Sequence, residues 1–147
     1  MLIHQQIEQD YLTAFKAHDQ ARVDVLRLVK AAIKNAEIDL RKHELTDAEA
    51  TTVLMKEAKK RKESIAMYRQ GNRPELAAAE EAELTAISSY LPTQISDEEI
   101  AMAVGAAVAE LKPTPKDFGR VMSAVMAKIK GQADGNRVAA AVKQLLK

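Results

Sequence analysis

Hydrophobic residues recur at steps of three and four along most of the chain, which is the spacing of one buried face of an α-helix. An early segment, residues 2–17, shows the pattern with Ile3, Ile7, Leu12 and Phe15. The segment from Gln20 to Lys42 is the clearest case, and its stripe consists of Leu26, Val29, Ile33, Ala36 and Leu40. Together with the breaks between stripes, the pattern predicts seven helices, at about residues 2–17, 20–42, 46–70, 74–91, 96–111, 115–130 and 136–146.

Polar and glycine residues mark where several of these helices begin and end. Thr46 and Glu49, and again Ser96 and Glu99, have the spacing of a capping box, in which each side chain bonds the backbone N–H of the other residue. Gly71 follows the third helix and is expected to adopt the left-handed conformation that ends helices.

The segment from Tyr90 to Ser96 is the expected domain boundary, because it combines a proline, a new helix cap and a change in composition. We expect a four-helix N-terminal domain, residues 1–92, and a small three-helix C-terminal domain, residues 93–147. Helix formers dominate the composition, while aromatic residues make up only 3% and Trp is absent, which is unlike a β-sandwich or barrel. The predicted fold is all-α.

The chain contains no cysteine. Disulfides, thiolate metal sites and cysteine catalysis are therefore excluded, and a reducing, cytoplasmic setting is expected. The N-terminal segment has no basic region followed by an apolar run, so no signal peptide is predicted. No stretch approaches the ~18 consecutive apolar residues of a transmembrane helix, so no membrane association is expected.

Recognisable catalytic and metal-binding patterns do not occur in the sequence. His4, His18 and His43 lie far apart, in none of the spacings that hold a metal. The glycine-rich loops that bind ATP or dinucleotides are missing, and the pair Ser88–Ser89 has neither nucleophile-elbow glycines nor a neighbouring Lys or His. We therefore predict no catalytic residue, no metal and no cofactor.

Basic residues are concentrated near the C-terminus, although the net charge of the chain is only +1. Residues 1–92 carry a net charge of −1, whereas residues 112–147 contain eight basic residues against Asp117 and Asp134, a net charge of +6. Such a region is typical of proteins that contact the phosphates of nucleic acids. We expect a surface that binds nucleic-acid phosphates here, formed by Lys116, Gly119, Arg120, Lys128, Lys130, Gly131, Asp134, Gly135 and Arg137.

Glycines are the second signal in this region. Gly119 lies inside a predicted helix, where glycine is unfavourable by about 1 kcal/mol, and such a residue usually allows another backbone or a ligand to come close. Gly131 and Gly135 could present backbone N–H groups and a helix N-terminus to phosphate oxygens. A tight turn between helices, with Asp134 as the cap, explains these two glycines equally well.

A second basic segment, residues 56–63, carries five positive charges. Glu57 and Glu63 are close enough in the sequence to form i,i+3 and i,i+4 pairs with them. We therefore expect a solvated helix face with salt bridges in this segment rather than a binding surface.

Five segments of the chain, in order and without large gaps, resemble the YqeY-like family. A single match would be weak, whereas five in register cover nearly the whole chain. The segments are Val25–Ile38, Lys56–Ser64, Glu83–Pro92 with its Tyr90-Leu-Pro, Phe118–Met122 and Lys130–Gly135.

The resemblance implies a likeness to the C-terminal helical and tail portions of the B subunit of glutamine-dependent aminoacyl-tRNA amidotransferase, whose tail contacts tRNA. Kinase, transamidation and glutamine-hydrolysing chemistry belong to other domains of that complex, so the resemblance implies no catalytic residue here. This chain has Phe118 where many relatives have methionine, which is a change in the core. The tail-like positions are Gly119, Arg120, Met122, Lys130, Gly131, Ala133, Asp134 and Gly135.

We therefore expect a non-catalytic protein that binds tRNA or another structured RNA, alone or as an accessory to tRNA-dependent amidation. A second interpretation is carbon–nitrogen ligase activity with glutamine as amido-N-donor, which requires amidotransferase subunits as partners. A third interpretation is a protein-interaction adaptor, in which the stripe formed by Arg27, Lys30 and Lys34 binds an acidic partner.

Overall fold

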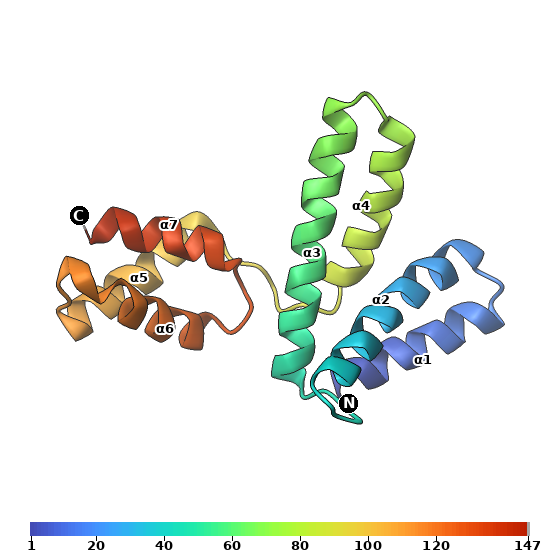
Figure 1. The fold of residues 1–147 in the computed structure, drawn as a ribbon, viewed down its shortest axis with the longest axis horizontal. Helices are drawn as coiled ribbons and strands as arrows, with labels where there is room; N and C mark the ends of the chain where they lie inside the picture. Colours follow the sequence, from blue (N-terminus) through green and yellow to red (C-terminus); the bar gives the residue numbers. More distant parts are fainter. Residues whose placement is uncertain (147) are drawn as a thin grey trace. The chain divides into compact units, whose positions relative to one another are not determined.

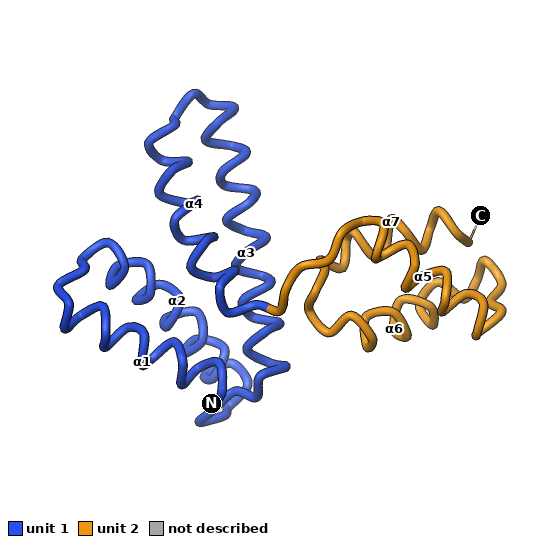
Figure 2. Tube along the Cα trace, turned by 180° about the vertical axis from the view of Figure 1, so that it is seen from behind, with its two compact units in different colours: residues 1–91 blue, residues 92–147 orange. Residues whose placement is uncertain are grey.

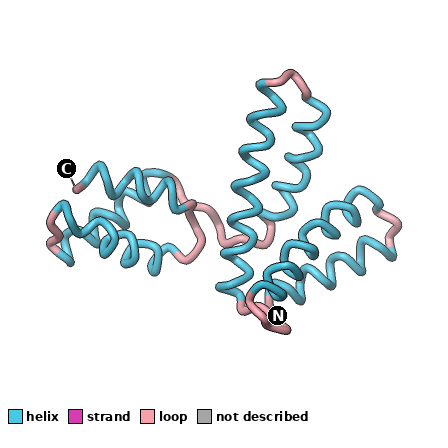
Figure 3. The backbone as a smooth tube through the Cα atoms, in the orientation of Figure 1, coloured by secondary structure: helices cyan, strands magenta, loops and turns pink. Residues whose placement is uncertain are grey.

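The protein is all-α, as the sequence predicts (Figure 1). The structure is a computed structural model that describes residues 1–146. Within that range it contains seven α-helices, one 3₁₀ turn and no strand (Figure 3). The elements are α1 (Ile3–Lys16), α2 (Gln20–Asp39), α3 (Asp47–Gln70), α4 (Pro74–Ser88), α5 (Asp97–Leu111), the 3₁₀ turn η1 (Pro115–Asp117), α6 (Phe118–Ile129) and α7 (Gly135–Leu145).

The two predicted capping boxes differ in detail. At α3 the box is complete, because the Thr46 hydroxyl accepts from the Glu49 N–H at 3.2 Å and the Glu49 carboxylate accepts from the Thr46 N–H at 3.0 Å. At α5 the Ser96 hydroxyl accepts from the Glu99 N–H at 3.2 Å, while the Glu99 carboxylate faces that hydroxyl, 3.4 Å away. In both helices the N-cap side chain satisfies one N–H group of the first turn.

Two helix ends differ from the prediction. Gly71 ends α3 with a φ of −83°, so the expectation of a left-handed glycine is wrong; Asn72 takes the left-handed conformation instead, with a φ of 57°. Asparagine tolerates that conformation better than most residues with a Cβ atom. The predicted helix 115–130 is divided into η1 and α6, and in η1 the Asp117 N–H donates to the Thr114 carbonyl oxygen at 2.9 Å, which is the bond of a 3₁₀ turn.

Contacts between Cα atoms divide the chain into two compact units, unit 1 (Met1–Leu91) and unit 2, which begins at Pro92 (Figure 2). In unit 1, α1 packs with α2 and α3 packs with α4, so this unit consists of two helical hairpins (Figure 1). Its main core forms where the hairpins meet. That core contains Ile7, Val29, Ile33, Leu45, Ala50, Leu54, Ala58 and Ile87.

Three hydrophobic residues of the sequence pattern lie largely outside the core of unit 1. Leu12 is 47% exposed, Phe15 is 58% exposed and Leu40, just after α2, is 49% exposed. The expectation that they extend the buried stripes is therefore wrong. The reason in α1 is that the helix buries the face that carries Ile7 and Ala14, and Leu12 and Phe15 lie on a neighbouring face.

Unit 2 is a bundle in which α5, α6 and α7 all contact one another. Its core is built from β-branched and small residues, which allow short helices to pack closely. The buried residues are Ile100, Val104, Ala107, Val121, Val125, Ile129, Ala133, Val138 and Val142. Phe118, Met122 and Met126 pack against this core and are partly buried.

Candidate nucleic-acid interface

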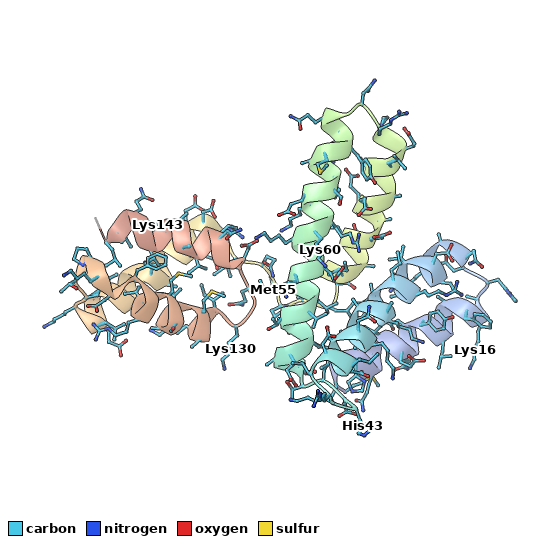
Figure 4. All side chains as sticks on the ribbon, viewed as in Figure 1. Lys16, His43, Met55, Lys60, Lys130 and Lys143 are labelled. Atoms are coloured by element: carbon cyan, nitrogen blue, oxygen red, sulfur yellow. The ribbon has the colours of Figure 1, made fainter. Side chains whose placement is uncertain are left out.

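The predicted RNA-binding residues lie toward both ends of α6. Lys116 and Arg120 lie at its start, in η1 and in the first turn, and Lys130 directly follows its last residue. A helix of 12 residues is about 18 Å long, so these cations are spread along the unit rather than gathered at one point. Lys143, on α7, points away from Lys130 (Figure 4).

At the start of α6, the Arg120 side chain contacts other residues of unit 2. The guanidinium donates to the Leu111 carbonyl oxygen at 3.2 Å and lies 3.5 Å from the Asp117 carboxylate. The pKa of Asp117 is lowered, first by the hydrogen bond from the Thr114 N–H and also by the charge of Arg120. Lys116 is exposed and forms no ion pair with any described residue, so its ammonium is the freer cation at this end.

Gly119 lies in the first turn of α6 and not inside a longer helix, which corrects the sequence-based expectation. A Cβ atom added there would meet nothing within 4 Å. Close packing by another described segment therefore does not explain this glycine. The open space beside it is compatible with the approach of a ligand.

Lys130 and Gly131 form the turn that ends α6, and both have a positive φ, 46° and 84°. The left-handed conformation is unfavourable by about 1 kcal/mol for a residue with a Cβ atom, whereas glycine adopts it readily. Lys130 is exposed, and within residues 1–146 it has no ion pair. Its ammonium is therefore the freer cation at the second end of α6.

The loop between α6 and α7 is a tight turn capped by Asp134. The Asp134 carboxylate accepts from the Asn136 N–H at 2.6 Å, and Gly135 is the first residue of α7. Ala133 is completely buried, which anchors the loop to the core of unit 2. The tight-turn explanation of the two glycines is thus the one that the structure shows, and phosphate binding by this loop stays a prediction.

Arg137 and Lys128 are paired with acidic residues of α5. Arg137 donates to the Asp97 carboxylate at 2.8 Å and to the Ile95 carbonyl oxygen at 2.9 Å. Lys128 lies 3.7 Å from the Glu110 carboxylate. Arg137 therefore joins the start of α7 to the start of α5, and its charge is partly neutralised before any ligand binds.

Two of the five cations in the basic segment of α3 belong to an ion-pair cluster. Arg61 lies 3.1 Å from Glu57, 3.3 Å from Glu80 and 3.1 Å from Glu83, and Lys60 lies 3.4 Å from Glu57. Burial disfavours the charged guanidinium, but the charges of the three glutamates outweigh it and raise the pKa of Arg61. The predicted salt bridges within the segment are confirmed for Glu57. The sequence does not predict the two partners of Arg61 on α4, Glu80 and Glu83.

The three histidines lie in different segments of unit 1. His4 Nε2 lies 3.2 Å from the Glu44 carboxylate, His18 occupies the turn after α1 with a φ of 58°, and His43 lies in the loop after α2 (Figure 4). In the part of the chain that the structure describes, no group of three or more His, Asp or Glu residues is arranged to hold a metal ion.

Residues 4–146 match the family described as Yqey-like protein. The chain belongs to this family. Within the described residues, no helix of this YqeY-like protein is both long and apolar enough to span a bilayer.

Two relatives of this YqeY-like chain carry the name "Altered inheritance of mitochondria protein 41, mitochondrial". The protein from Pyrenophora tritici-repentis is 28% identical over 130 residues, which cover 86% of this chain and 71% of the relative. The protein from Eremothecium gossypii is 31% identical over 148 residues, which cover 95% of this chain and 78% of the relative. The names assign those two proteins to mitochondria and state no molecular activity.

The α3 and α4 segments that carry the family resemblance meet in unit 1, where Arg61 pairs with Glu83. The Tyr90 hydroxyl, from the Tyr-Leu-Pro that follows α4, donates to the Asp10 carboxylate of α1 at 2.6 Å. Burial and this hydrogen bond raise the pKa of Tyr90 above its usual range. The Tyr90–Asp10 bond therefore joins the two hairpins of unit 1, while the Arg61–Glu83 pair joins α3 to α4 within one of them.

Proposed function

We propose that this YqeY-like protein is a non-catalytic RNA-binding protein, with tRNA as the ligand and unit 2, the predicted tail-like domain, as the binding surface. One observation carries the proposal. Lys116 and Lys130 are both exposed, lie at opposite ends of α6 and form no ion pair within the described chain. They belong to the C-terminal region whose net charge is +6.

The chemistry of this surface favours recognition of the RNA backbone. Lysine ammonium groups contact phosphate oxygens and release counterions, so binding should weaken as salt rises. Phe118 is the only aromatic residue after Tyr90 in the sequence, and it is partly buried against the core of unit 2. Recognition would therefore rest on the shape and charge of a structured RNA, with little stacking on bases.

Association with tRNA-dependent amidation extends the proposal, and it rests on the resemblance to the amidotransferase B subunit. The chain would act as an accessory that brings tRNA to catalytic subunits in the cytoplasm. A carbon–nitrogen ligase reaction with glutamine as donor would belong to that complex. We expect the purified chain alone to hydrolyse no glutamine and to consume no ATP, because its sequence has neither cysteine nor a phosphate-binding loop.

Filter binding of labelled tRNA to the full chain tests the proposal. We expect salt-dependent binding, and Lys116→Ala or Lys130→Ala should each weaken it by about 1 kcal/mol, roughly fivefold, and reduce the salt slope by about one. Lys16→Ala, at the last residue of α1 in unit 1 (Figure 4), is the matched control and should change neither quantity. Binding that is insensitive to salt, or no binding, would refute the proposal.

A further inference from the structure

A groove of about 460 Å³ runs between α1 and α2 of unit 1. Its floor contains Ile7, which is 1% exposed, and Ile33, which is 5% exposed. Its α1 side carries His4 and Glu8. These two core residues close the floor, the walls carry charged side chains, and the groove shares no residue with the surface assigned above to RNA.

The α2 wall of the groove is a row of cations. Arg27, Lys30 and Lys34 follow one another at steps of three and four residues, so they lie on one face of the helix. The side chains of Arg27 and Lys34 are 60% and 72% exposed, and their acidic neighbours are 3.9 and 3.6 Å away on the same helix. The Arg27–Asp24 pair is exposed on both sides, so it is worth little and leaves Arg27 available to a partner. The Glu37 side chain is only 12% exposed, so a partner carboxylate would share the exposed Lys34 ammonium with it.

Exposed apolar side chains continue the groove along α1. The rings of Tyr11 and Phe15 stack with centroids 6.3 Å apart, and Lys30 Nζ lies 4.1 Å from the centre of the Tyr11 ring. Tyr11 is also the main cause that raises the pKa of Arg27. Phe15 and Leu12 are about half exposed. Aromatic and Arg residues around an apolar centre are typical of the sites that dominate protein–protein binding.

We propose that this groove binds an amphipathic helix of a partner protein, with the carboxylates of that helix on Arg27 and Lys34. These two residues are seven positions apart on α2, two helical turns or about 10.5 Å. A helix with Asp or Glu seven positions apart reproduces that distance. Its apolar face would cover Phe15 and Leu12, which are about half exposed, as in other helix-in-groove complexes.

Exposed apolar side chains favour a protein over a nucleic acid as the occupant. Phe15 is 58% exposed and Leu12 is 47% exposed. A phosphate chain would leave both uncovered, whereas the apolar face of an amphipathic helix can pack on them. Residues 1–92 have a net charge of −1, so this region lacks the excess of basic residues that is typical of nucleic-acid-binding surfaces.

Two synthetic helical peptides with the same leucine face test the proposal. One has Glu at two positions seven residues apart beside that face, and the other has Lys at the same positions. We expect the Glu peptide to bind the full chain at least tenfold more tightly by fluorescence anisotropy and to shift the amide resonances of residues 8–15 and 27–37. The double variant Arg27→Glu, Lys34→Glu should reverse the preference, and Phe15→Ala should weaken binding at least fivefold.

The matched control is Lys59→Glu, Lys62→Glu, which reverses two exposed charges of α3 and should leave the peptide preference unchanged. Urea unfolding of each variant separates a lost contact from a lost fold. Absence of binding by both peptides, equal binding of both, or displacement of the Glu peptide by tRNA would overturn the proposal. Loss of tRNA binding in the unit 2 variants would not affect it, because the two surfaces share no residue.

Discussion

Two basic segments of the chain, residues 56–63 in α3 and residues 112–130 in unit 2, have similar charge and very different surroundings. Arg61 is mostly buried among three glutamates, two of which come from α4. Lys116 and Lys130 are exposed and, within the described residues, form no ion pair, which is also true of Lys56, Lys59 and Lys62 of α3. A basic residue that is already neutralised stabilises the fold, whereas an exposed and unpaired one is available to a phosphate. Charge along the sequence therefore does not distinguish these roles until partners from other helices are known. The exposed lysines of the two segments differ in the charge around them, because residues 1–92 have a net charge of −1 and residues 112–147 have a net charge of +6.

Removal of the Arg61 guanidinium in α3 should have the largest effect on the stability of the fold. Arg61→Ala leaves Glu57, Glu80 and Glu83 together without their shared cation, and each is less than a fifth exposed. We expect the free energy of unfolding to fall by about 3 kcal/mol, because unpaired buried charges are strongly unfavourable. Urea unfolding followed by circular dichroism measures this change. A loss below about 0.5 kcal/mol, the usual range for exposed sites, would show that the cluster does not stabilise the fold.

The pH dependence of the same variant sharpens the comparison. Burial is the main cause that raises the pKa of Glu83, with the charges of Glu80 and Glu57 adding to it against that of Arg61. A carboxyl with a raised pKa is protonated at a higher pH in the folded state than in the unfolded state, so protonation stabilises the fold as the pH falls. The destabilisation by Arg61→Ala should therefore shrink as the pH falls from 7 toward 4. A destabilisation that is constant over this range would contradict the role given to the three carboxylates.

Two substitutions of Lys130 should separate the effect of its charge on tRNA binding from the effect of its left-handed backbone on stability. Lys130→Gly and Lys130→Ala remove the same ammonium, so both should weaken tRNA binding about fivefold. Only glycine relieves the positive φ of 46°, so Lys130→Gly should raise the free energy of unfolding by up to about 1 kcal/mol relative to Lys130→Ala. Paired measurements of unfolding and tRNA affinity check this. Unequal tRNA affinities in the two variants would mean that the turn, and not the charge, matters for binding.

Glu49 offers a smaller, pH-dependent contrast within unit 1. A hydrogen bond from Lys42 at 2.7 Å, together with those from the N–H and hydroxyl of Thr46, lowers the pKa of Glu49 from 4.5 to about 2. The ionised form is therefore favoured in the folded state, and its contribution is complete above pH 4.5 and lost as the pH falls toward 2. Glu49→Gln should lower the melting temperature at pH 7 and make little difference near pH 2. An equal loss at both pH values would exclude this cause.

Local signals explain most of what the sequence predicts correctly. Each helix has a repeat of apolar residues or a cap within a few positions, and the Thr46–Glu49 box was predicted down to both hydrogen bonds. The segment from residue 115 is predicted to begin a helix, whereas the structure has a short 3₁₀ turn there. Its bond, from the Asp117 N–H to the Thr114 carbonyl oxygen, is not encoded by hydrophobic spacing.

Contacts between distant segments explain what the sequence does not predict. Glu80 and Glu83 reach Arg61 only because α4 packs along α3, and Arg137 meets Asp97 across 40 positions of sequence. Leu45 is a completely buried residue in a loop, where no helical repeat marks it. The same holds for the candidate site. The sequence does not show that Arg120, Lys128 and Arg137 form ion pairs. It therefore does not distinguish these three residues from the unpaired Lys116 and Lys130.

The most direct test of the account compares two matched pairs of lysines by their effect on tRNA binding over a series of salt concentrations. Lys116→Ala, Lys130→Ala removes the unpaired cations of unit 2, and Lys56→Ala, Lys59→Ala removes two exposed cations of α3. The account predicts that the first pair lowers affinity by about 2 kcal/mol and the salt slope by about two, with less than about a twofold change in affinity for the second pair. Equal effects, or a larger effect of the α3 pair, would contradict the assignment of RNA binding to unit 2.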